Sequence, residues 1–116
     1  MYNEAHALAR AIKESREFQD YKHWHEIVMS DPKNKQMVED YQKKAILLQY
    51  ELIDNKEPDQ KKLEEIQTLE GILMANSTTK SYMEAQMRIS TIYGDIQKIL
   101  SDAIELPMES KPEIAE

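Results

Sequence analysis

The sequence contains no cysteine and, among its 116 residues, only two glycines and four prolines. Without cysteine the chain cannot build a disulfide scaffold, a thiolate zinc site, a cysteine-held iron–sulfur cluster or a cysteine nucleophile. The scarcity of glycine and proline argues against a sandwich or barrel, which needs many tight turns. No apolar run approaches the roughly 18 residues that span a membrane, and the first twenty residues lack a secretory or transit signal. We therefore expect a soluble, cytoplasmic protein with no membrane contact.

Basic residues are outnumbered as well. Fifteen lysines and arginines against 22 aspartates and glutamates give a net charge of −7. This balance disfavours direct binding to nucleic acid, which needs a broad basic surface. The lysine clusters in the middle of the chain alternate with carboxylates, a pattern typical of ion pairs on helix surfaces; they are Lys33, Lys35, Lys43, Lys44, Lys61 and Lys62. RNA binding through these lysines is an alternative, and it would weaken steeply with added salt.

What the sequence does contain is helical periodicity. Apolar residues recur three or four positions apart in five segments, and no stretch alternates long enough with the period of two expected of a strand. The spacing predicts an all-α fold, an elongated bundle of about five helices that forms one domain over residues 1–105 and is followed by a flexible tail over residues 106–116. The longest series is Tyr82, Ala85, Ile89, Ile92, Ile96, Ile99, Ala103 and Leu106.

Polar residues and prolines mark the predicted helix ends. Asp31-Pro32 and Glu57-Pro58 each predict a helix start with proline at the first helical position, where its missing N–H costs nothing. Ser15 is a candidate cap for the second helix, and Ser77 or Thr78 for the last one.

The two long helices carry more apolar surface than one thin bundle can bury. A helix over 78–105 would be about 42 Å long and the third helix about 36 Å, whereas a compact chain of this size has a radius of gyration of about 13 Å. We expect these two helices to be antiparallel, and their second apolar stripe predicts self-association as a dimer or higher oligomer. Gly94 suits a close helix crossing or is a tolerated neutral residue. The candidate interface residues are Ile46, Tyr50, Met87, Tyr93, Gly94 and Leu100.

Motifs for catalysis or cofactor binding are missing from the sequence. No serine lies in a Gly-x-Ser-x-Gly elbow, and neither glycine belongs to a phosphate-binding loop. Asp20, His23 and Glu26, spaced by three, are the one candidate metal group, and a metal-dependent helical enzyme is the corresponding alternative. Because a metal site needs several convergent ligands, we favour a solvated helix face there, with no cofactor and no catalytic activity. The seven methionines suit either core filling or an adaptable binding surface.

Three stretches of the chain, AHALARAIKESREFQDYK, DPKNKQMVEDYQKKAILLQ and NSTTKSYMEAQMRISTIYGDIQKILSDAI, occur in an order that resembles a known family. The resemblance, over roughly residues 1–105, is to the YlbF/YmcA family of small helical regulatory proteins from Firmicutes. Its features are a Leu-Ala-x-x-Ile start, an Asp-Pro break, a glutamine-rich long helix and a Tyr-Met-x-Ala-x-x-Arg-Ile finish.

The resemblance implies a helical protein that forms dimers or higher oligomers and has no catalytic activity of its own. Family members regulate competence, sporulation and biofilm formation, and some assist ribonuclease Y in RNA maturation. Ribonuclease Y or a family paralogue is therefore the implied partner of a regulatory adaptor. Some members hold iron–sulfur clusters through C-terminal cysteines, which this chain lacks, so it looks closer to a short, cysteine-free branch. A purely structural oligomer is the remaining alternative.

Overall fold

The computed structural model describes residues 1–55, 57 and 59–105. Over these residues the backbone forms five α-helices and no β-strand, which confirms the all-helical prediction. The predicted tail over 106–116 lies outside the described residues. In chain order the helices are α1 (Tyr2–Lys13), α2 (Arg16–Met29), α3 (Pro32–Asn55), α4 (Gln60–Ala75) and α5 (Ser77–Ile104).

The helices α2 and α3 begin at the capped positions that the sequence predicted. The side chain of Ser15 accepts a hydrogen bond from the backbone N–H of Phe18 at 3.1 Å. At the start of α3, Asp31 accepts from the N–H of Lys33 at 3.0 Å, and Pro32 is the first helical residue. Each cap satisfies an N–H that the first turn of a helix leaves without a partner.

The last two helices begin at other residues than predicted. The helix expected to start at Glu57-Pro58 begins at Gln60, because Asp59 is extended and caps it by accepting from the N–H of Lys61 at 2.9 Å; Pro58 itself lies outside the described residues. The cap of α5 is Asn76, not Ser77 or Thr78, which are already helical. Asn76 Oδ1 accepts from two backbone N–H groups, those of Thr78 at 2.9 Å and Thr79 at 3.3 Å.

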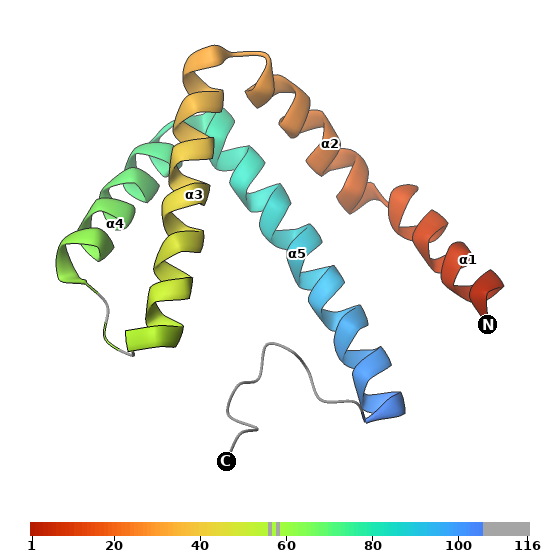
Figure 1. Cartoon of the computed structure of the whole chain (residues 1–116). Helices are drawn as coiled ribbons and strands as arrows, with labels where there is room; N and C mark the ends of the chain where they lie inside the picture. The colour runs from red at the N-terminus through yellow and green to blue at the C-terminus, as the bar shows by residue number, and fades with distance from the viewer. Residues whose placement is uncertain (56, 58, 106–116) are drawn as a thin grey trace.

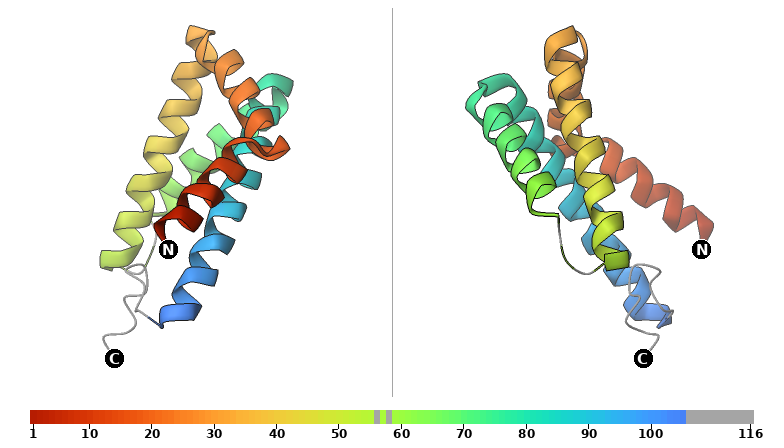
Figure 2. Two further views of the ribbon diagram at one scale, coloured as in Figure 1. Left: turned by 90° about the vertical axis from the view of Figure 1, so that its right-hand side faces the viewer. Right: turned by 60° about the vertical axis from the view of Figure 1, so that its left-hand side comes forward.

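The five helices form two arms that meet at an apex. The long arm consists of α1, α2 and α5, and the short arm of α3 and α4 (Figure 1). The antiparallel pairs are α2 with α5 and α3 with α4. The two long helices, α3 and α5, are not the antiparallel pair that was expected: both leave the apex in the same general direction and then diverge (Figures 1 and 2). The partner of α3 is α4, which runs back along it toward the apex (Figure 1).

The core lies at the apex, where four helices contribute one buried side chain each: Val28, Val38, Leu73 and Tyr82. The ring of Tyr82 stacks on that of Tyr21, with centroids 5.8 Å apart, and also contacts His25. Further apolar side chains pack around this cluster, namely Trp24, Met29, Met37, Tyr41 and Met83. Burial of this kind is the main force that holds the two arms together.

Away from the apex the molecule is open and flat. Its principal extents are 43 × 41 × 17 Å and its radius of gyration is 17.1 Å, against about 13 Å for a compact chain of this length. The departure from a sphere was predicted from the helix lengths, and it takes the form of two spread arms. Large parts of both long helices consequently have no neighbour on one side.

Candidate interaction surface

The residues considered for metal binding are not gathered into a site. Asp20 accepts a hydrogen bond from Arg88 of α5 at 3.0 Å, and this ion pair ties α2 to α5. His23 lies edge-on to Trp24, with ring centroids 5.0 Å apart, and Glu26 is exposed. Within the part of the chain that the structure describes, no group of three histidine, aspartate or glutamate side chains could hold a metal ion. The arrangement therefore gives the metal-enzyme alternative no support.

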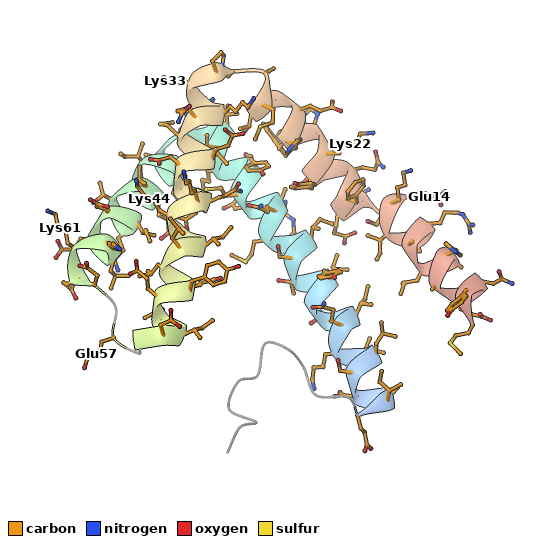
Figure 3. The ribbon with its side chains drawn as sticks, viewed as in Figure 1. Glu14, Lys22, Lys33, Lys44, Glu57 and Lys61 are labelled. Atoms are coloured by element: carbon orange, nitrogen blue, oxygen red, sulfur yellow. The ribbon has the colours of Figure 1, made fainter. Side chains whose placement is uncertain are left out.

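Two of the six clustered lysines form surface ion pairs of the kind that the alternating pattern predicted. Lys44 pairs with Asp40 one turn away at 3.4 Å, and Lys62 of α4 pairs with Glu51 of α3. The hydrogen bond from Lys62 to Glu51 raises the pKa of that ammonium. Lys22 and Lys61 point outward from opposite arms, away from the gap between them (Figure 3). Basic charge is thus dispersed over the outer surface.

The predicted interface residues of α3 are exposed. Ile46 and Tyr50 are one turn apart on the same helix face, and Ile53 continues this face toward the end of the helix. Tyr50 is 64 % exposed and Ile53 is 63 % exposed. One turn before Ile46, the side chain of Gln42 donates a hydrogen bond to Gln86 of α5 at 3.2 Å. This face of α3 is consequently directed toward the side on which α5 lies.

The predicted interface residues of α5 are exposed as well. Met87 and Gly94 lie two turns apart on one face of the helix, and Tyr93 and Leu100 lie two turns apart on another. A Cβ added at Gly94 would meet nothing within 4 Å, so none of the five described helices crosses closely there. All four residues are accessible to another molecule.

Sequence reasoning missed a third exposed group. The main stripe of α5 was predicted as one continuous apolar series, yet it is buried only at Tyr82 and Ala85. Farther along, Ile89, Ile92 and Ile96 are half-buried, and Ile99 is 66 % exposed. The difference in helix length could have indicated this exposure, because α5 has 28 residues, whereas α2, the helix packed against it, has 14.

A groove of about 480 Å³ opens where α3, α4 and α5 meet. Methionines supply much of its wall, and Tyr41 contributes an aromatic ring; the methionines are Met74, Met83 and Met87. Burial, followed by the negative charge of Glu70, raises the pKa of the Tyr41 phenol. Of these methionines, Met83 packs against the core, whereas Met87 is exposed.

The geometry defines a class of protein: a small two-armed helical protein whose prominent surface feature is exposed apolar helix. Among the described residues, no helix combines the length and apolar character needed to cross a bilayer. A family profile described as control of competence regulator ComK, YlbF/YmcA, matches residues 1–105. The chain belongs to this YlbF/YmcA family, as its sequence pattern suggested.

Curated relatives cover nearly the whole chain, and a solved structure has a similar fold. A UPF0342 protein of Symbiobacterium thermophilum is 32 % identical over 108 residues, which cover 93 % of this chain and 96 % of the relative. A UPF0342 protein of Caldicellulosiruptor bescii is 35 % identical over 109 residues, covering 94 % and 92 % respectively. The fold is similar to that of a protein of unknown function (DUF964) from Bacillus stearothermophilus, with a TM-score of 0.75, 20 % identity and coverage of 90 % of this chain and 91 % of the other.

Proposed function

We propose that this protein is a non-enzymatic regulatory adaptor of the cytoplasm, which self-associates and binds a protein partner. One observation carries the proposal: long apolar side chains on α3 and α5 remain exposed after the five helices have packed. Each square ångström of apolar surface removed from water contributes about 25 cal/mol. Contiguous apolar strips of this kind are typical of interaction surfaces.

The exposed residues divide between two faces, and we assign one role to each. Ile46, Tyr50, Met87 and Gly94 border the gap between the arms and form the partner face. Tyr93 and Leu100 belong to the free part of α5 and form the self-association face. The methionine-lined groove beside Met87 favours a partner helix, since methionine side chains adapt to varied apolar surfaces.

The family description connects this class of protein with the control of a competence regulator. Ribonuclease Y and a family paralogue are the partners that the resemblance implies, and each can be tested in purified form. Immobilised full-length protein should retain one of them, and an Ile46→Asp/Tyr50→Asp variant should lose it. A Gln36→Asp variant, which changes an exposed α3 residue outside the partner face, is the matched control and should bind normally.

Two results would count against the proposal. Equal retention by the partner-face variant and its control would show that α3 is not the docking surface. Retention of neither purified protein by the wild-type chain would remove these two partners. The self-association part is tested separately, by light scattering of the protein alone over a range of concentrations.

A further inference from the structure

Two stretches of helix keep an apolar stripe that the single chain does not bury. One is the distal half of α5, residues 92–104, where Tyr93, Ile99 and Leu100 are exposed. The other is α1, whose apolar positions Ala5, Leu8 and Ile12 follow helical spacing although no residue of the helix is buried. Strongly amphipathic helices are normally found with their apolar face covered.

The α1 of the same chain is held away from the distal half of α5. The Ser15 hydroxyl donates to the carbonyl of Ile12 at 2.6 Å, and the Gln19 amide donates to the carbonyl of Lys13 at 2.8 Å. These bonds fix the joint between α1 and α2, where the chain bends, and α1 diverges from α5 toward its N-terminal end (Figures 1 and 2). The bare stripe of α5 is thus open to a helix from outside.

We propose that two copies of this chain exchange their first helices, so that α1 of each copy lies antiparallel along the distal half of α5 of the other. This inference rests on the self-association put forward in the proposed function and names the helices that carry it. In an antiparallel register that places Leu8 opposite Leu100, Ile12 faces Ile96 and Ala5 faces Ala103. Both stripes then advance by the same steps of three and four residues, and large side chains meet large ones.

Charge favours the same pairing. The last turn of α1 carries Arg10 and Lys13, whereas the acidic residues around the distal stripe are Asp95, Asp102 and Glu105, against the single cation Lys98. Lys98 is already paired with Asp102 at 3.1 Å. Over the described ranges neither Lys13 nor Asp95 has an ion-pair partner, and in the proposed register the two residues lie at the same level along the helix pair. Such complementarity directs which surfaces meet.

The available area is also sufficient. About seven apolar side chains from α1 and the distal half of α5, each offering on the order of 100 Å², give close to the roughly 800 Å² per partner of a stable interface. Because the exchange is two-fold symmetric, each copy contributes both surfaces.

The absence of cysteine makes a direct test simple. A mass-tagged Leu8→Cys chain is mixed and refolded with an untagged Leu100→Cys chain, then oxidised mildly. We expect a tagged–untagged disulfide dimer in at least about tenfold excess over the yield with Thr91→Cys, which lies on the opposite face of α5. Leu8 and Leu100 are both exposed in the single chain, so the cysteine variants at these positions should fold normally. The Leu8→Cys/Leu100→Cys double variant should form a dimer closed by two disulfides.

Three outcomes would overturn the inference, and each has a different meaning. An internal disulfide in a monomeric double variant would show that each α1 covers its own α5. A wild-type dimer that gives no Leu8–Leu100 cross-link would reject this helix pairing and leave self-association standing. A wild-type protein that stays monomeric at all concentrations would reject both the exchange and the self-association in the proposed function.

Discussion

The two halves of α5 carry the same apolar stripe but lie in opposite environments. In the proximal half, residues 77–89, Tyr82 is 2 % exposed and Ala85 is fully buried. In the distal half, Ile99 and Leu100 are largely exposed. The periodicity does not change between the halves, so the difference comes from the partner helix. The 14 residues of α2 extend about 21 Å, half the length of α5.

An apolar stripe indicates which side of a helix is covered, but not what covers it. The stripe determines which side of a helix needs to be covered. It does not determine whether the cover comes from the same chain, a second copy or another protein. In the proximal half the cover is α2, with its aromatic residues Tyr21 and His25. In the distal half the spacing is unchanged, but Ile92 and Ile96 are only half-buried and Ile99 is exposed.

The largest expected effect comes from shortening one buried side chain in the proximal half of α5. Tyr82→Ala removes a buried ring that stacks on Tyr21 and contacts His25. We expect the free energy of unfolding to fall by about 3–5 kcal/mol, the usual cost of deleting a large buried aromatic side chain. Urea denaturation followed by circular dichroism measures this change.

The matched control is Tyr93→Ala in the distal half, measured at a concentration where the protein is monomeric. Because Tyr93 is 61 % exposed, we expect a change within about 0.5 kcal/mol. Equal losses of unfolding free energy at Tyr82 and Tyr93 would mean that the distal half of α5 is packed within the single chain as well.

The next largest effect concerns association. Leu100→Asp places a charge in the proposed contact twice, once in each copy, and each copy loses the burial of a leucine, worth about 1.5–3 kcal/mol. The dissociation constant of the dimer should rise by about a hundredfold or more, while the helix content stays the same because Leu100 is exposed in the single chain. Sedimentation and far-ultraviolet circular dichroism report these two quantities.

Thr91→Asp, on the polar face of α5, is the control for added charge and should leave the mass unchanged. If Leu100→Asp remained a folded oligomer of unchanged mass, Leu100 would not belong to the self-association face.

Much of the fold could be predicted from local sequence signals. The five helices follow from apolar spacing, and Ser15 and Asp31 act as the caps that their residue types suggest. The sequence could not show that Asn76, rather than Ser77 or Thr78, caps α5. All three residue types cap helices, and only the backbone conformation decides between them. The start of α4 was missed for a related reason, since Pro58 and Asp59 are competing start signals and Asp59 provides the cap.

The candidate surface was only partly predictable. Ile46, Tyr50, Tyr93 and Leu100 were recognised because they lie off the main stripes, and they are exposed. Ile99 lies on the main stripe and was not among the predicted interface residues, yet it is 66 % exposed. Its exposure depends on where α2 ends relative to α5, and that alignment follows from the packing at the apex. Periodicity within one helix cannot report the length of the helix opposite.

A smaller effect is expected at the start of the proximal half. Asn76→Ala removes a side chain that accepts from the N–H groups of Thr78 and Thr79. We expect the free energy of unfolding to fall by about 1 kcal/mol, the typical contribution of an N-cap. Ser77→Ala should change it by less than about 0.5 kcal/mol, since no cap hydrogen bond is lost. A larger loss at Ser77 than at Asn76 would contradict the cap assignment.

The smallest expected effect distinguishes the two interpretations of Gly94. Within the described chain neither Gly94 nor Gly71 of α4 has anything within 4 Å of an added Cβ. Both Gly94→Ala and Gly71→Ala should therefore raise the free energy of unfolding by about 0.5–1 kcal/mol, because alanine loses less backbone entropy in a helix. Only Gly94→Ala should also weaken partner binding, since Gly94 lies on the partner face two turns from Met87, where a closely crossing helix would meet the new methyl group. Equal partner binding by both variants would make Gly94 a neutral helix glycine and would confine the partner face of α5 to Met87 and the groove beside it.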